Sequence, residues 1–142
     1  MVVNDLRKNQ KLKLSEHVLA GATILGIADL PITVTILDMP ELSTSKYQFI
    51  AMIDMAFTDT YRLYIAKFQP TNEVKLAVAH ELIHLKQFVD GRLTISSDRT
   101  IGLFDGEPIL PPYSPSQPHE VEAFKEMIPL IKKIKKYLKQ NK

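Results

Sequence analysis

Apolar residues in the first part of the chain repeat first with helical spacing and then with strand alternation. In residues 13–28 they fall on one face of a helix, which Leu30-Pro31 is expected to end. In residues 32–37 isoleucine and valine alternate with threonine, which predicts a strand. Residues 47–57 and 61–68 are apolar runs separated by a polar turn, so we expect them to pair as a hairpin.

The second half of the chain contains a long helical pattern, a short hairpin and a last helix. Residues 71–89 are expected to form a helix, with a polar cap at its start and an Asp-Gly pair after its end. Strand patterns at residues 100–104 and 107–110 predict a second hairpin. A proline-rich loop over residues 111–118 precedes the last helix, and Pro129 is expected to kink or split that helix.

These patterns predict an α+β fold in a single domain. The length of 142 residues is typical of one domain, and an apolar share of 45% suits a packed core. The chain contains no cysteine, which excludes disulfides, a thiolate zinc cluster and a cysteine nucleophile. We expect residues 1–142 to form one domain, with residues 1–12 flexible and residues 125–142 forming a basic C-terminal helix.

Positive charge is concentrated at the C-terminal end of the chain. Residues 125–142 hold seven lysines and one glutamate, although the whole chain has 18 basic and 16 acidic residues. A packed helix with a solvated lysine face is the favoured interpretation of this segment. Contact with nucleic acid or another acidic partner is the less favoured one.

The apolar stretch over residues 18–37 is about as long as a membrane span. Asp29 and Pro31 interrupt it, so we interpret it as a helix, a turn and a strand. The N-terminus has no apolar run of signal-peptide length before the polar residues that reach Lys13. We therefore expect a cytoplasmic protein with no membrane partner.

The sequence His80-Glu81-Leu82-Ile83-His84 is an H-E-x-x-H motif inside the predicted helix 71–89. Residues four apart on a helix face the same way, so the two imidazoles can bind one ion. Glu81 is turned by about 100° from His80 and can reach a water on that ion without being a ligand. Imidazole and carboxylate ligands suit Zn²⁺. The alternative is a helix whose two histidines only form hydrogen bonds.

A catalytic zinc site needs a third protein ligand and an open position for water. The chain has two other histidines, and one of them, His17, is expected to be a surface or core residue of the helix over residues 13–28 and not a ligand. The start of the last helix, near residue 118, offers His119, Glu120 and Glu122 as potential ligands within four positions. Glu120 and Glu122 lie on nearly opposite faces of a helix, so only one of these carboxylates is expected to bind the ion.

An H-E-x-x-H motif followed by a helix carrying E-x-x-A resembles the gluzincin metallopeptidases. The resemblance makes Glu120 the third ligand, with Ala123 as the small residue after it. The chain is most similar to small phage and bacterial metallopeptidases of minimal gluzincin type. The residues that match their pattern, in order, are His80, Glu81, His84, Gln87, Gly91, Tyr113, Pro118, Glu120, Glu122 and Ala123.

Two residues depart from that pattern. His119 stands where the small family usually has an aromatic residue, so a histidine third ligand, as in the more distant SprT-like proteins, remains an alternative. Phe124 stands where larger gluzincins have an acidic residue behind their ligands, so the sequence does not identify what orients the two histidines.

The resemblance implies a zincin-like fold, in which a small mixed or antiparallel sheet packs on the H-E-x-x-H helix between N-terminal and C-terminal helices. It implies a zinc-dependent peptidase with His80, His84 and Glu120 as metal ligands. Glu81 would be the general base toward a metal-activated water. Tyr113 is the best candidate to donate to the oxyanion, and the alternative is that it is a packed aromatic residue of the loop. A peptide or protein substrate would add as a strand along residues 47–57 or 61–68.

Two other functions compete with the peptidase. One is a zincin-fold metal-binding protein that acts as a regulatory or phage binding module without proteolysis. The other is a structural or nucleic-acid-binding protein in which the motif is accidental. The intact Glu81 favours the peptidase, because a pure binding module has no need of a general base.

Overall fold

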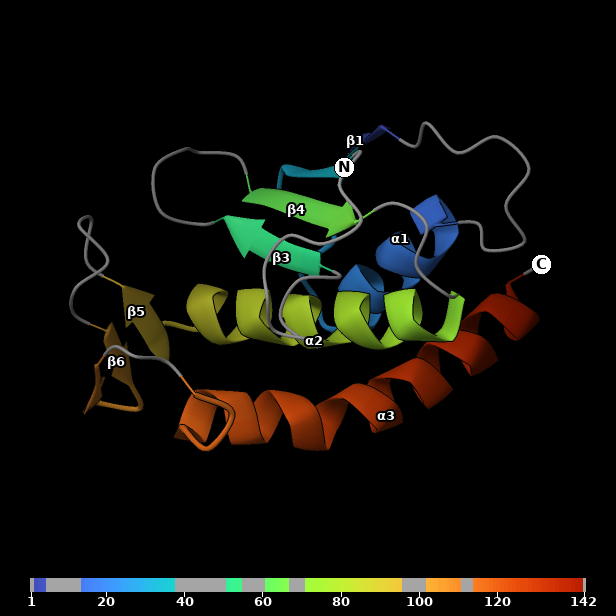
Figure 1. Ribbon diagram of the computed structural model, residues 1–142. Coiled ribbons are helices and arrows are strands. Elements are labelled where there is room, and N and C mark those ends of the chain that lie inside the picture. The colour runs from blue at the N-terminus through green and yellow to red at the C-terminus, as the bar shows by residue number, and fades with distance from the viewer. Residues whose placement is uncertain are drawn as a thin grey trace.

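Figure 1 shows the computed structural model of the chain. It describes residues 2–4, 14–37, 51–54, 61–66, 71–95, 102–110 and 114–141. These residues form an α+β fold with three helices and seven strands, in agreement with the predicted class. The elements are β1 (Val2–Asn4), α1 (Leu14–Ile24), β2 (Ile32–Leu37), β3 (Ala51–Asp54), β4 (Tyr61–Ala66), α2 (Thr71–Val89), β5 (Leu93–Ile95), β6 (Gly102–Phe104), β7 (Glu107–Ile109) and α3 (Pro118–Gln140).

The larger sheet is mixed and has the strand order β1-β2-β4-β3. β2 runs parallel to β1 and β4, whereas β3 and β4 pair antiparallel, as expected for the predicted hairpin. The expected strand over residues 32–37 is confirmed at both ends. β1 lies within residues 1–12, the segment expected to be flexible, and pairs with β2 from Val2 to Asn4.

Helix α2 lies between the larger sheet and α3 (Figure 1). It contacts β3 and β4 on one side and α3 on the other, and α1 packs against both helices. The buried side chains at this helical junction are small or aliphatic, which lets the helices approach closely. They are Ala20, Ala79, Ile83, Ala123, Leu130 and Ile134.

Helix α1 ends at Ile24, before the expected end near residue 28. The cause is Gly26, whose φ of 74° places it in the left-handed region that glycine tolerates. Its backbone N–H donates to Thr23 O at 3.1 Å, and Ile27 N–H donates to Ala22 O at 2.8 Å. These two bonds form a Schellman cap, so the helix stops although the apolar pattern continues.

Helix α3 is continuous from Pro118 to Gln140, with Pro129 inside it. Of the expected kink or split at Pro129, the split does not occur, and Figure 1 shows one helix that curves along its length. Its buried residues Leu130 and Ile134 follow Pro129 directly, so packing against α1 holds the chain helical past the missing N–H. Residues 125–140 are thus part of this longer helix, which ends at Gln140.

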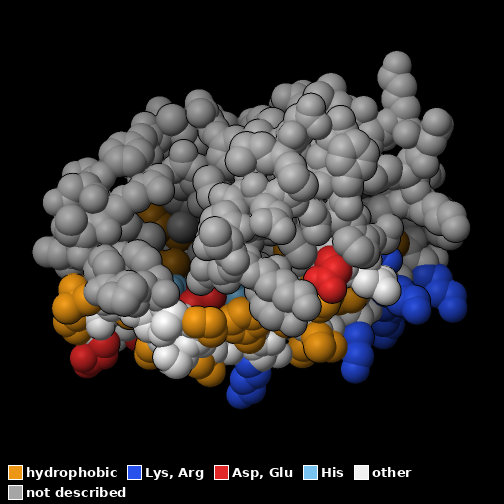
Figure 2. Space-filling view, viewed as in Figure 1, with side chains coloured by type: hydrophobic (Ala, Val, Ile, Leu, Met, Phe, Trp, Pro, Cys, Tyr) orange, Lys and Arg blue, Asp and Glu red, His pale blue; other side chains and the backbone are white. Residues whose placement is uncertain are grey.

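The lysines of the second half of α3 face solvent, while its apolar side faces α1. Figure 2 shows basic side chains gathered at that end of the molecule. The exposed lysines of α3 are Lys125, Lys132, Lys133, Lys135, Lys136 and Lys139. None of the described helices combines the length and the apolar composition that a membrane span requires.

The smaller sheet is antiparallel, with the order β5-β6-β7. The predicted hairpin is confirmed: β6 and β7 flank a turn in which Asp105 and Gly106 have φ values of 50° and 85°. β5 adds a strand that the sequence pattern did not predict, and Leu93 in it pairs with Phe104. A second, smaller hydrophobic core is formed by the buried side chains of Leu93, Phe104 and Ile109.

Candidate metal centre

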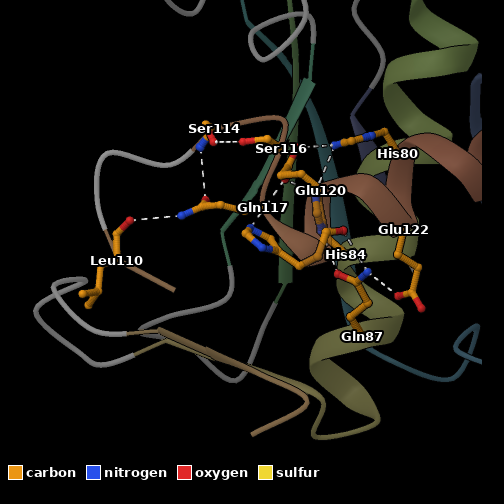
Figure 3. A network of polar contacts seen from close by, with 10 residues as sticks. His80, His84, Gln87, Leu110, Ser114, Ser116, Gln117, Glu120 and Glu122 are labelled. Atoms are coloured by element: carbon orange, nitrogen blue, oxygen red, sulfur yellow. Dashed lines mark hydrogen bonds and ion pairs between the residues drawn. The ribbon is translucent and has the colours of Figure 1, made fainter. Parts of the chain in front are cut away.

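The H-E-x-x-H motif lies in α2, and the two histidines face the first turn of α3 (Figure 3). Helix α3 begins at Pro118, which is suited to a first helical position because it needs no N–H partner. Gln117 precedes it in an extended conformation. The Gln117 side chain donates to Leu110 O at 3.1 Å and accepts from Ser114 N at 3.1 Å. These bonds fix the start of α3, and with it Glu120, relative to the end of β7.

Glu120 contacts both histidines of the motif. Its Oε2 lies 3.1 Å from His80 Nε2, and its Oε1 lies 2.5 Å from His84 Nε2. The two Nε2 atoms are 3.0 Å apart. Within the described residues, His80, His84 and Glu120 form a group that could hold a metal ion, with one donor atom from each residue within 4.8 Å of the others.

The donor set and its spacing fit a divalent cation. Ligand atoms about 2.0–2.1 Å from a tetrahedral zinc lie about 3.3 Å from one another. The measured separations of 3.0, 3.1 and 2.5 Å are slightly shorter, so the side chains would need to move apart by less than about 1 Å. Two imidazoles and one carboxylate are also a ligand set that zinc uses in catalytic sites.

The same three residues are electrostatically coupled. Burial acts to lower the pKa of His84, but the hydrogen bond to Glu120 and the charges of Glu81 and Glu120 outweigh it and raise the pKa to about 9. Burial acts to raise the pKa of Glu120, but hydrogen bonds from His80 and His84 outweigh it and hold the pKa well below its usual range. Glu120 is therefore ionised at neutral pH.

The other two candidate ligands are not part of this group. His119 is buried, and its Nε2 lies 3.8 Å from Glu120 Oε1. Its ring lies 5.6 Å from the ring of His84 and 6.0 Å from that of Phe104, between the centre and the small sheet. Burial lowers the pKa of His119. Of the three candidates for the third ligand, Glu120 is thus the one whose side chain contacts both histidines of the motif.

Glu122 points to a different set of partners on the other side of α3. Its Oε2 accepts from Gln87 Nε2 at 2.6 Å, and its two oxygens accept from Arg92 at 2.8 and 3.1 Å. Arg92 also binds the Asp105 carboxylate through two bonds of 2.8 and 2.9 Å. These bonds raise the pKa of Arg92 and lower that of Asp105.

Gln87 connects these partners to the centre, and sequence reasoning gave it no role. It is fully buried, and its Oε1 lies 2.9 Å from His84 Nδ1. Its Nε2 donates to His119 O at 3.1 Å as well as to Glu122. The available signal was a polar residue three positions after His84, on the same helix face.

Phe124, four residues after Glu120 in α3, packs against the other histidine of the motif. Its ring centre lies 4.5 Å from that of His80, with an angle of 50° between the ring planes. His80 Nδ1 is buried and has no hydrogen-bond partner in the part of the chain that the structure describes. The two ligand histidines are therefore supported differently: His84 by a hydrogen bond, and His80 by ring packing.

The remaining predicted residues lie beside or outside this centre. Glu81 follows His80 in α2, and its charge is close enough to act on His84. Tyr113, the predicted oxyanion donor, lies outside the described residues. His17 is buried in α1, so it takes the core placement of the two that the sequence left open, and it forms a hydrogen bond with the backbone of Lys75.

Comparison with known proteins identifies no relative: no protein-family model, no curated protein and no solved structure matches this chain. The candidate metal centre therefore rests on the geometry of α2 and α3 and on the chemistry of their side chains.

Proposed function

We propose that this chain is a zinc-dependent peptidase of minimal gluzincin type, with a zincin-like fold. His80, His84 and Glu120 would hold the ion, and Glu81 would be the general base. The observation that carries the proposal is the convergence of the two α2 imidazoles with a carboxylate from the start of α3, at separations of 2.5 to 3.1 Å.

The chemistry of the site favours hydrolysis over binding alone. A divalent cation held by this set would polarise a scissile carbonyl and lower the pKa of water toward neutrality. Glu81 is next to His80 in the motif and is not a member of the metal-binding group. Its carboxylate can accept the proton of the attacking water and donate it to the leaving amine.

The sheet supports the proposed mode of substrate binding. β4 lies between β2 and β3, so residues 61–66 are not at an edge, whereas β3 is the terminal strand of the described sheet. β3 also contacts α2, the helix that carries the motif. We therefore assign the added substrate strand to the edge at β3, with backbone hydrogen bonds providing affinity.

Metal analysis and peptide digestion of the purified chain test the proposal. We expect about one equivalent of zinc per chain and cleavage of a peptide library that stops on addition of a chelator. Glu81→Gln should retain the zinc and lose cleavage by a factor of about 10² or more. Glu73→Gln, a change of the same type in the first turn of α2, is the matched control and should cleave normally.

Each other result has a distinct meaning. Zinc binding without cleavage by the wild type would contradict the peptidase and favour the binding-module alternative. A chain that retains no divalent metal would remove the basis of the whole proposal. Cleavage by Glu81→Gln at the wild-type rate would show that Glu81 is not the base.

A further inference from the structure

The side-chain amide of Gln87 has only one orientation that satisfies its neighbours. On one side it faces the Glu122 carboxylate and the His119 carbonyl, and both groups can only accept hydrogen bonds at neutral pH. The NH₂ group of the amide must therefore lie on that side. Oxygen Oε1, an acceptor, is left to face His84 Nδ1 at 2.9 Å.

This orientation determines which nitrogen of His84 keeps its hydrogen when the ring is neutral, the form in which imidazole binds a metal ion. Because Oε1 of Gln87 can only accept, His84 Nδ1 must be the donor in their hydrogen bond. A neutral imidazole has one N–H, so the lone pair then lies on Nε2. Nε2 is the atom that faces His80 and Glu120.

Arg92 holds Glu122 in the position that this arrangement needs. Helix α2 ends in a Schellman cap at Gly91, whose φ is 76°, and Arg92 N–H donates to Gln87 O at 3.0 Å. The cap turns the chain back, so that the guanidinium lies between Glu122 and Asp105. It neutralises Glu122 and keeps it as an acceptor for Gln87.

We infer that Gln87, held by Glu122 and Arg92, is a positioning residue that fixes the ring orientation and the metal-binding tautomer of His84. The inference rests on the proposed metal site, but not on peptide cleavage. It gives the buried Gln87 amide a role at His84 only, since His80 packs against the ring of Phe124 instead. Partners of this kind are worth about 10–100-fold in metal affinity.

Zinc affinity, measured by competition with a chelating dye, tests the inference without relying on catalysis. Gln87→Leu removes the acceptor and should weaken zinc binding by about 10–100-fold. Lys86→Leu places the same side chain one position earlier, away from the contact with His84, and is the matched control. It should bind zinc as the wild type does.

An exchange of the two polar partners separates positioning from mere packing. In Gln87→Glu the new carboxylate faces Glu122 at the site of the present 2.6 Å contact, so repulsion should weaken zinc binding. Adding Glu122→Gln places an amide at position 122, and its NH₂ group can donate to the carboxylate introduced at position 87. That carboxylate can also accept from His84 Nδ1–H. We expect the double variant to bind zinc more tightly than Gln87→Glu but less tightly than the wild type, because the carboxylate at position 87 still faces His119 O, which needs a donor.

Nuclear magnetic resonance of the zinc-loaded protein gives a second readout. In the wild type and the double variant, the His84 ring should show a protonated Nδ1 whose hydrogen exchanges slowly with water. In Gln87→Leu that signal should broaden or disappear through fast exchange.

Wild-type affinity in a folded Gln87→Leu variant would overturn the inference. So would a double variant as weak as Gln87→Glu, or a wild type that binds no zinc. If Gln87→Leu does not fold, the comparison of Gln87→Glu with the double variant still decides. Zinc binding without peptide cleavage would contradict the proposed peptidase and leave this test intact.

Discussion

Replacing Glu120 by glutamine is the sharpest test of the ligand set, because it removes a charge while keeping the shape. In the structure each carboxylate oxygen of Glu120 contacts a different imidazole, at 3.1 Å from His80 and 2.5 Å from His84. Glu120 is also the only negatively charged member of the metal-binding group. An amide at this position keeps one acceptor, but it loses the charge that balances a divalent cation.

The magnitude follows from the place of Glu120 in the group. Loss of a partner behind a metal ligand costs about 10–100-fold in affinity, so loss of one of three direct ligands should cost about 100-fold or more. Zinc at about 100 times the wild-type Kd stabilises the folded state by about 2.7 kcal/mol. For a chain of this length about 1 kcal/mol changes Tm by about 3–4 °C, which predicts a rise of about 10 °C.

Thermal unfolding with and without zinc at that fixed concentration measures the effect. In Glu120→Gln the zinc concentration would be close to the weakened Kd, so the stabilisation should fall to about 0.4 kcal/mol, or about 1–2 °C. Glu126→Gln, an exposed change of the same type on α3, should retain the full rise. Glu122→Gln should lose only a few-fold in affinity and keep more than half of the rise, because it acts through Gln87.

The reasoning fails if Glu120→Gln keeps the wild-type rise. It also fails if Glu122→Gln, or His119→Phe with its ring packing preserved, loses more of the rise than Glu120→Gln does. Either pattern would assign the third ligand to another residue at the start of α3.

Three further predictions concern stability. The pKa of His17 is lowered to about 4, mainly by burial and then by the charge of Lys75, so the unfolded chain takes up a proton at this residue before the folded chain does. The free energy of unfolding should therefore fall by about 2–3 kcal/mol between about pH 7.5 and about pH 4.5. Urea unfolding of His17→Gln should show little of this difference. Gly21→Val should cost about 1–3 kcal/mol in urea unfolding, because even a Cβ would lie 2.7 Å from buried Leu82 Cδ1; an unchanged midpoint would refute this packing argument. Gly91→Ala should cost about 1–2 kcal/mol through strain at a φ of 76°, and Gly91→Asn should cost less, so equal losses would count against the cap.

The parts of the fold that the sequence predicted are those set by local spacing. The four-residue interval between His80 and His84 places both rings on one helix face, whatever packs against them. The turn at Asp105 and Gly106 is specified by its own residues. The end of α1 was also encoded locally, by Gly26, but the continuing apolar pattern concealed it.

The choice of third ligand depended on tertiary packing. His119, Glu120 and Glu122 all lie in the first turns of α3, and the rotation of that helix decides which of them meets α2. Burial of Ala123, Leu130 and Ile134 against the other helices sets this rotation, and such contacts between distant segments cannot be predicted from local sequence spacing.

The different roles of the Glu120 and Glu122 carboxylates follow from the groups that each of them contacts. Both are carboxylates in the first turns of one helix, yet Glu120 faces two imidazoles, whereas Glu122 faces a guanidinium and an amide. An incoming cation can replace the hydrogens that imidazoles share with Glu120, because neutral imidazole is itself a ligand. It gains little at Glu122, whose charge Arg92 already balances. The Arg92 guanidinium therefore keeps Glu122 from competing for the ion and holds its carboxylate in place for Gln87. In this way one of the two neighbouring carboxylates can bind the ion and the other can support a ligand of the same centre.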